Sequence, residues 1–411
     1  MSSEQTSFAR IRRETEALVR GLTPEDCMVQ AMPDVSPPKW HLAHTTWFFE
    51  TFVLEREVSG YRSPSPAYRE LFNSYYEAVG PRHPRPERGH LSRPTLSEIF
   101  AYRERVDAAM QRLLEERGST PMIELGLQHE QQHQELLVMD VKYNFSRNPL
   151  RPAYVSEPLA QCSAAAPLEF RRFEAGLVHA GVAPGGAEFT FDSERPDHRR
   201  FLEPFELATR LVTNAELLEF IAAGGYQTPS LWLSDGWAWA REHCVEAPLY
   251  WRRDADGVLH EFTAHGELLL DPQAPVCHVS GYEAAAFAAW AGARLPTEFE
   301  WEHAARQAGP IDITRGEALR LHPGAAARGS LTQLFGEVWQ WTRSAYEPYP
   351  GFAPEPGAVG EYNGKFMCGQ WVLRGGSVAT PRGHTRVTYR NFFYPQQRWP
   401  FTGIRLAREA R

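Results

Sequence analysis

The chain has 411 residues, of which 43% are hydrophobic and 23% charged. This is the composition of a globular protein with room for two or three domains. Its formal net charge of −8 disfavours nucleic acid as the main partner, because a phosphate backbone is bound chiefly by Lys and Arg. The longest small-apolar run, Ala284–Ala293, is too short to cross a membrane.

The five cysteines are widely spaced and form no C-x-x-C pair. This spacing disfavours a disulfide scaffold or a zinc ribbon and fits a reducing compartment. The first residues, MSSEQTSFARIRRE, are polar and charged and lack the apolar core of a signal peptide. We therefore expect a cytoplasmic protein.

Residues 1–150 are predicted to form a four-helix bundle, because four segments have apolar residues at helical spacing. Two of the helix starts carry capping signals: Ser36 precedes two prolines, and a capping-box-like Ser119/Thr120 region precedes Pro121. The four predicted helices are Thr6–Arg20, Lys39–Val58, Thr95–Glu116 and Glu124–Tyr143.

Residues 151–170 are rich in Pro, Ala and Ser and are predicted to be a linker. From 171 to 411 short apolar runs alternate with Gly and Pro, which predicts an α+β domain with much irregular structure. Strands are expected at Phe189–Phe191 and Trp371–Arg374, and helices at Asn214–Ala222 and Tyr282–Ala291.

The most specific local pattern is His129-Glu130-Gln131-Gln132-His133. Two histidines four residues apart on a helix share one face, so both imidazoles can reach one metal ion. Trp40-His41-Leu42-Ala43-His44 offers a third imidazole from another predicted helix, and the spacing does not say whether it is His41 or His44. Three imidazoles would hold a divalent metal and leave coordination positions free.

The same pattern has two other interpretations. A histidine pair at this spacing often lies on the surface or belongs to a polar cluster whose hydrogen bonds are satisfied. H-E-x-x-H is also the zinc-metalloprotease pattern, in which Glu130 would be the general base. No third histidine ligand follows shortly downstream, where one class of these proteases would place it.

Taken together, eight strings in order resemble the sulfoxide synthases of ergothioneine biosynthesis. The resemblance implies a DinB-like helical bundle followed by a domain like the formylglycine-generating enzymes, which have a C-type-lectin-like fold. It also implies that the iron ligands are His44, His129 and His133. The strings are SPPKWHLAHTTWFFE (36–50), FNSYYEAVG (72–80), HEQQHQELL (129–137), RLPTEFEWE (294–302), GEVWQWT (336–342), LRGGS (373–377), RNFFYP (390–395) and GIRLA (403–407).

The resemblance further implies an iron(II) enzyme with dioxygen as co-substrate. It would join hercynine, the trimethylated betaine of histidine, to cysteine or γ-glutamylcysteine and yield a sulfoxide. Tyr75 and Tyr76 match tyrosines that supply protons in one branch of the family, and which of the two does so here stays open. Gln132 matches a residue that contacts the acceptor imidazole. Asn391 and Phe392 match positions lining the trimethylammonium pocket, where an aromatic face suits a quaternary ammonium.

Recognition of the donor carboxylate calls for arginine, and the candidates are Arg82, Arg85, Arg88 and Arg398. Relatives that use γ-glutamylcysteine tend to carry an acid and an arginine where this chain has Phe393 and Gln397, which favours a smaller donor. Formylglycine-generating enzymes need two nearby cysteines, whereas Cys368 stands alone here. The second domain is therefore expected to bind substrate.

Two other functions remain open from the sequence. A sister group of the family makes selenoneine from hercynine and a selenosugar on the same scaffold. A binding module for betaine-like ligands, with no catalysis, would need the aromatic wall and no metal. The sequence leaves the donor and the oligomeric state undetermined.

Overall fold

The computed structural model describes residues 3–183, 185, 188–309, 311 and 320–410. The chain divides into two compact units. The first comprises Met1–Tyr154 and Glu355–Tyr362, and the second comprises Val155–Pro354 and Asn363–Arg411. The short segment Glu355–Tyr362 thus belongs to the first unit, although it lies within the range predicted for the second domain.

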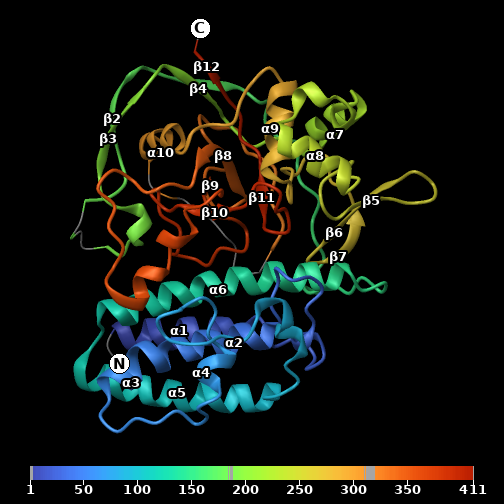
Figure 1. Ribbon diagram of the computed structural model, residues 1–411. Coiled ribbons are helices and arrows are strands. Elements are labelled where there is room, and N and C mark those ends of the chain that lie inside the picture. The colour runs from blue at the N-terminus through green and yellow to red at the C-terminus, as the bar shows by residue number, and fades with distance from the viewer. Residues whose placement is uncertain (1–2, 184, 186–187, 310, 312–319, 411) are drawn as a thin grey trace. The chain divides into compact units, whose positions relative to one another are not determined.

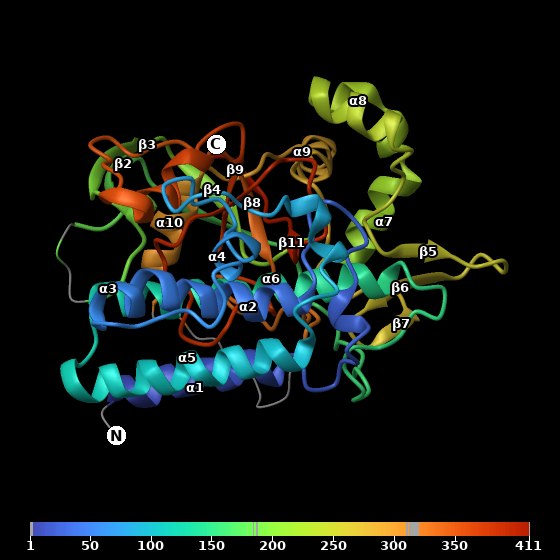
Figure 2. The ribbon, with the colours of Figure 1, turned by 60° about the horizontal axis from the view of Figure 1, so that its bottom comes forward.

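The first unit is a helical bundle in which α1, α2, α5 and α6 lie side by side (Figures 1 and 2). This arrangement confirms the predicted four-helix bundle. The helices are α1 Ser3–Ala17, α2 Pro38–Phe49, α3 Glu55–Glu57, α4 Tyr68–Leu71, α5 Leu96–Arg117 and α6 Pro121–Ser146. A π-helical turn, Glu50–Leu54, joins α2 to α3, and 3-10 turns lie at Asp26–Met28, Arg85–His90 and Gly357–Glu361.

Local capping explains two of the helix starts. Thr95 and Glu98 form a capping box at α5, in which the Glu98 carboxylate accepts the Thr95 N–H at 2.6 Å. At α6 the cap lies within the predicted Ser119/Thr120 region, where the Thr120 side chain accepts the Ile123 N–H. The predicted Ser36 cap is wrong, because α2 begins after Pro37 with no side-chain cap bond.

Helix α2 is the centre of the bundle, because all twelve of its residues are buried. It packs against both α5 and α6. A polar side chain on α2 therefore has no access to bulk water and must find its partners inside the protein. This placement brings the histidines of α2 into the interior.

The second unit contains four helices and twelve strands among its described residues. The helices are α7 Asn214–Ala222, α8 Ser234–Glu242, α9 Gly281–Trp290 and α10 Glu298–Gln307. The strands are β1 Phe170–Phe173, β2 Gly176–Ala180, β3 His198–Leu202, β4 Phe205–Ala208, β5 Trp251–Arg253, β6 Leu259–Thr263, β7 Gly266–Leu269, β8 Trp339–Ala345, β9 Trp371–Arg374, β10 Asn391–Phe393, β11 Thr402–Gly403 and β12 Ala407–Glu409. Short 3-10 turns lie at Asp192–Glu194, Gly225–Gln227, Pro229–Leu231 and Gly364–Phe366.

Predictions for this unit had mixed outcomes. The helix at Asn214–Ala222 and the strand at Trp371–Arg374 are confirmed, and the helix predicted at Tyr282–Ala291 is shifted by one residue. The strand predicted at Phe189–Phe191 is wrong, because these residues form no strand and Phe191 directly precedes a 3-10 turn at Asp192–Glu194. Helices α8 and α10 were not predicted.

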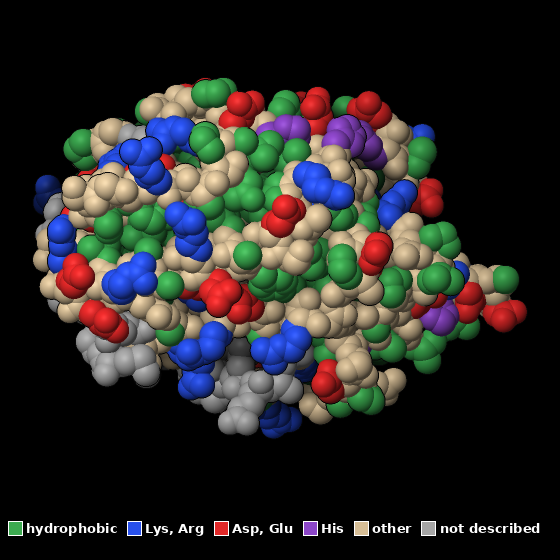
Figure 3. Space-filling view, turned by 90° about the horizontal axis from the view of Figure 1, so that it is seen from below, with side chains coloured by type: hydrophobic (Ala, Val, Ile, Leu, Met, Phe, Trp, Pro, Cys, Tyr) green, Lys and Arg blue, Asp and Glu red, His purple; other side chains and the backbone are tan. Residues whose placement is uncertain are grey.

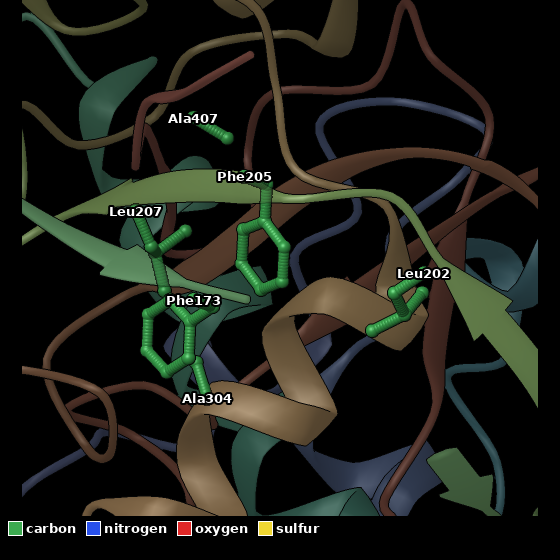
Figure 4. Close-up of a cluster of buried hydrophobic side chains, with 6 residues drawn as sticks. All are labelled: Phe173, Leu202, Phe205, Leu207, Ala304 and Ala407. Atoms are coloured by element: carbon green, nitrogen blue, oxygen red, sulfur yellow. The ribbon is translucent and has the colours of Figure 1, made fainter. Parts of the chain in front are cut away.

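The strands form four small sheets, in the orders β1-β4-β12, β10-β9-β8-β11, β2-β3 and β5-β6-β7. The pairings are antiparallel except that of β11 with β8. A hydrophobic core gathers beneath the first sheet (Figure 4). There the rings of Phe173 and Phe205 stack with centroids 4.8 Å apart. The buried core residues are Phe173, Leu202, Phe205, Leu207, Ala304 and Ala407.

Charged side chains of both signs are interspersed on the face shown in Figure 3, among the residues drawn in colour. This mixture differs from the continuous basic field that binds a phosphate backbone. Within the described part of the chain, every helix is too short or too polar to cross a bilayer.

Candidate functional site

Three histidines converge inside the first unit. His44 comes from α2, and His129 and His133 come from α6. One ring nitrogen from each lies within 4.8 Å of the others, and the Nε2 atoms of His44 and His129 are 3.2 Å apart. All three side chains are buried. The structure therefore brings together the three residues that the resemblance implied as metal ligands.

The orientation of His44 follows from its neighbours. Its ring lies between two indoles of the same helix, Trp40 at 4.6 Å and Trp47 at 5.5 Å between centroids, both nearly parallel to it. Its Nδ1 is 2.6 Å from the Phe72 carbonyl oxygen, which can only accept a hydrogen bond. Nδ1 therefore carries the proton, and Nε2 is bare and faces the other two histidines.

Burial, as the largest cause, lowers the pKa of all three imidazoles: that of His129 falls to about 3, and those of His44 and His133 lie well below 6.5. The rings are neutral at pH 7 and present lone pairs rather than charges. Three neutral imidazoles suit a divalent transition metal such as iron or zinc. The donor set thus fits the implied iron(II).

His41 lies outside this group. Its Nδ1 is 2.9 Å from Nδ1 of His133, and its Nε2 is 3.1 Å from an Asp140 carboxylate oxygen. Both ring nitrogens are therefore occupied by neighbours. The group of histidines that could hold a metal ion therefore contains His44, and its role as a ligand stays a prediction.

Glu130 points away from the three histidines. Its carboxylate accepts hydrogen bonds from Arg12 at 2.8 Å, Arg103 at 3.0 Å and Thr15 at 2.7 Å. Burial opposes ionisation, but the two guanidinium groups hold the pKa of Glu130 at about 2. A carboxylate held in this way cannot act as a general base at neutral pH. The zinc-hydrolase alternative loses the residue that it requires.

Tyr76 and Tyr75 occupy different environments. Tyr76 is fully buried among aromatic rings, with Phe52 at 5.0 Å between centroids. Tyr75 is half-buried and stacks on Tyr76 at 4.6 Å. Burial, reinforced by the Tyr75 and Tyr362 phenols, raises the pKa of Tyr76 well above 10. Tyr76 therefore keeps its proton at neutral pH.

Tyr362 belongs to the site and was not predicted. Its hydroxyl donates to Oε1 of Gln132, and its ring lies 5.6 Å from that of His129 between centroids. The neighbouring Glu361 carboxylate accepts the backbone N–H groups of Glu77 and Ala78, at 3.0 and 2.9 Å. These bonds attach the segment Glu355–Tyr362 to the turn that carries Tyr75 and Tyr76.

The three candidate arginines of the first unit differ in burial. Arg82 is exposed and ion-paired with Glu77 at 2.7 Å, and Arg85 is also exposed. Arg88 is buried, and its guanidinium carbon lies 3.4 Å from the centroid of the Trp40 ring. The same Trp40 stacks on His44, so Arg88 is the arginine tied most directly to the histidine group.

The remaining candidates lie in the second unit. Phe392 is part of an aromatic stack, with Tyr346 at 4.2 Å and Phe366 at 5.8 Å between centroids. Asn391 precedes it in β10 and accepts the Phe392 N–H at 2.9 Å. Arg398 already has protein partners, because it donates to the Ala247 carbonyl at 2.9 Å. It also forms an ion pair with Glu283. Their part in substrate binding stays a prediction.

Comparison with known domains agrees with this architecture. Residues 7–137 match the DinB superfamily. Residues 172–323 and 322–410 match the sulfatase-modifying factor enzyme 1-like domain. The chain is therefore a DinB-type helical bundle followed by a sulfatase-modifying-factor domain.

Whole-chain relatives narrow this class. A hercynine oxygenase of Mycolicibacterium thermoresistibile is 33% identical, over 91% of this chain and 88% of the relative. One of Mycolicibacterium smegmatis is also 33% identical, over 92% of each chain. Ergothioneine biosynthesis protein 1 of Schizosaccharomyces pombe is 29% identical over 54% of this chain and 28% of its own. The chain belongs to the hercynine oxygenase family.

Proposed function

We propose that this chain is an oxygen-dependent, mononuclear non-haem iron(II) enzyme that joins hercynine to a thiol donor, giving a hercynyl sulfoxide in ergothioneine biosynthesis. The single observation that carries the proposal is the convergence of His44, His129 and His133, neutral and buried, within 4.8 Å of one another. Family membership supplies the acceptor, because the relatives are named for hercynine.

The overall reaction balances without a further reductant. Hercynine loses the hydrogen on the carbon between its ring nitrogens, and the donor loses its thiol hydrogen. One oxygen atom of dioxygen enters the sulfoxide, and the other leaves as water with these two hydrogens. Iron(II) bound by three imidazoles supplies open coordination positions and the redox chemistry for dioxygen.

The protein side chains orient the substrates and move protons. Gln132 is held by the Tyr362 hydroxyl and is proposed to contact the acceptor imidazole. Burial keeps the phenolic proton on Tyr76 at neutral pH, and Tyr76 or Tyr75, which stacks on it, is the proposed proton donor. The aromatic stack of Phe392 suits a trimethylammonium group, which cannot donate hydrogen bonds.

Arginine recognises the donor carboxylate in this proposal. Arg88, buried against Trp40, and the exposed Arg85 and Arg82 are the candidates in the bundle. The donor is cysteine or γ-glutamylcysteine, and Phe393 and Gln397 favour the smaller one. A selenosugar donor, giving a C–Se bond, is the alternative.

The test uses protein purified without oxygen and loaded with iron(II). Hercynine is offered with cysteine, γ-glutamylcysteine or a selenosugar, dioxygen uptake is recorded, and products are identified by mass. We expect uptake that requires both hercynine and iron, together with a hercynyl sulfoxide product. A C–Se product alone would replace the thiol donor with a selenium donor.

This experiment includes a variant that removes a proposed iron ligand and a control variant. His44→Ala should abolish iron-dependent uptake, because it removes one of three ligands. His243→Ala is the matched control, because His243 is exposed at the end of α8 and its ring contacts the Trp239 carbonyl. Activity with zinc that needs no dioxygen would overturn the proposal.

A further inference from the structure

A chain of buried contacts extends from His133 away from the three-histidine group. His41 Nδ1 lies 2.9 Å from His133 Nδ1, and His41 Nε2 lies 3.1 Å from Oδ2 of Asp140. The same carboxylate oxygen accepts the Ser36 backbone N–H at 2.8 Å. His41 and Asp140 are each only 2% exposed, so water does not compete for these contacts.

The ring nitrogen that carries the hydrogen in each histidine can be assigned by starting from the Asp140 carboxylate. A carboxylate only accepts, so the contact with Asp140 requires a hydrogen on Nε2 of His41. A neutral imidazole carries one N–H, and burial disfavours the charged form. Nδ1 of His41 is therefore bare and accepts from His133. The hydrogen of that contact sits on Nδ1 of His133, which leaves Nε2 of His133 bare.

We propose that His41 and Asp140 are positioning residues that hold His133 as the Nδ1–H tautomer, so that its Nε2 is the atom offered to a metal ion. This inference rests on the proposed function, because it assigns a role to neighbours of the proposed iron ligands. A carboxylate or carbonyl behind a ligating histidine fixes its tautomer and raises its basicity.

The other two proposed ligands differ from His133 in what lies behind the imidazole ring. His44 has its own acceptor, the Phe72 carbonyl at 2.6 Å from Nδ1, which likewise frees Nε2. His129 Nδ1 is buried without a hydrogen-bond partner among the described residues. Two of the three ligands therefore have a protein group that fixes the tautomer, and for His133 that group is a second histidine linked to a carboxylate.

A purely structural role for His41 would have a different consequence. In that case the side chain only satisfies the Asp140 carboxylate in the core, and its loss would lower stability without changing the metal affinity. The two roles are separated by measuring metal binding and folding on the same variants.

The first experiment titrates metal-free protein with Co²⁺ alone and follows the visible absorption of the bound ion. His41→Leu should weaken Co²⁺ binding by about 10- to 100-fold, the usual effect of losing such a partner. His41→Gln should stay close to wild type, because its amide can accept from His133 and donate to Asp140. Gln134→Leu is the matched control: Gln134 is buried on α6, the helix of His133, but bonds to Ile11 and Thr15.

The second experiment needs no metal. Long-range proton–nitrogen NMR spectra of histidine-labelled, metal-free protein distinguish a protonated ring nitrogen from a bare one. We expect Nδ1 of His133 and Nε2 of His41 to be protonated in wild type. His133 should become a mixture of tautomers in His41→Leu. Should that variant not fold, the wild-type and His41→Gln spectra still decide the assignment.

The outcomes separate this inference from the proposed function. Wild-type protein that does not bind Co²⁺, or His44→Ala that binds it as wild type does, would contradict the metal site itself. Normal binding by wild type and by His41→Leu alike would overturn only the role of His41. A wild-type spectrum with the His133 proton on Nε2 would also overturn it.

Discussion

Replacing Glu130 by Gln tests whether the acid of the H-E-x-x-H pattern stabilises the bundle instead of taking part in catalysis. In the wild type this fully buried carboxylate lies between Arg12 and Arg103. Glutamine keeps the shape but removes the charge, so both guanidinium groups lose one counterion. Arg12 keeps Asp107 at 2.7 Å, and Arg103 keeps Glu16 at 3.3 Å.

The magnitude follows from the pKa. A value depressed from 4.5 to about 2 corresponds to about 3 kcal/mol of stability. This agrees with the low end of the cost of breaking a buried ion pair, about 3–5 kcal/mol. The remaining partners of the two arginines explain why the low end applies.

The sign of the pH dependence is also fixed. Because the folded-state pKa is the lower one, this stabilisation is present above pH 4.5 and is lost as the pH falls towards about 2. Glu130→Gln should be less stable at neutral pH and should lack this part of the acid-induced loss.

The assay is hydrogen–deuterium exchange of peptides from α1 and α6, which reports local opening free energies. Glu130→Gln should lower protection there by about 3 kcal/mol and leave Co²⁺ affinity unchanged. Glu124→Gln, on the same helix but partly exposed, is the control. Unchanged protection in Glu130→Gln, or a well-folded variant that has lost its activity, would refute this account.

Three further substitutions probe other contacts. Tyr362→Phe removes the hydroxyl that donates a hydrogen bond to Gln132. Hercynine binding, measured by calorimetry, should weaken by about 0.5–1.5 kcal/mol. An unchanged affinity would exclude a role for this hydrogen bond in hercynine binding. Gly126→Ala would place a Cβ on α6 only 2.5 Å from a ring atom of Phe49 on α2. Thermal unfolding should therefore show a free energy of unfolding lower by about 1–3 kcal/mol. An unchanged value would mean that α2 and α6 can move apart at no cost. Glu298→Gln removes the buried carboxylate that forms ion pairs with Arg374 at 2.9 Å and with Arg390 at 2.8 Å. Urea unfolding should show a free energy of unfolding lower by about 3–5 kcal/mol. An unchanged value would contradict the importance of these ion pairs.

The parts of the fold that sequence predicted well depend on neighbouring residues. The Thr120–Pro121 start of α6 follows from a cap and a proline within one turn. The Asn214–Ala222 helix follows from a capping box of the same local kind. Helix α10 also starts with a capping box, of Thr297 and Glu300, so a usable local signal was missed there. Helix α8 has no side-chain cap bond at its start.

The roles of Glu130 and His41 were beyond sequence reasoning for a different reason. The motif places Glu130 beside two histidines, but its partner Arg12 is 118 residues away on α1. His41 and His44 look equivalent by spacing, and contacts with distant residues distinguish them. Asp140 is 99 residues from His41, and His129 is 85 residues from His44. Side-chain direction on a buried helix depends on which elements pack around it.

Tyr362 had no usable signal in the sequence. It lies 230 residues from Gln132, inside a range predicted to belong to the second domain. Its assignment to the first unit depends on the segment Glu355–Tyr362 returning to the bundle, where Glu361 binds the backbone of Glu77 and Ala78. The position of this segment against the bundle depends on hydrogen bonds between residues far apart in the sequence, which no local pattern predicts.

The central claim is that His44, His129 and His133 share one ferrous ion. X-ray absorption spectroscopy of protein loaded with one equivalent of iron(II) under anaerobic conditions tests this directly. We predict scattering from three imidazoles around iron in wild type and from fewer in His44→Ala. A wild-type spectrum without imidazole scattering, or one that His44→Ala leaves unchanged, would contradict it.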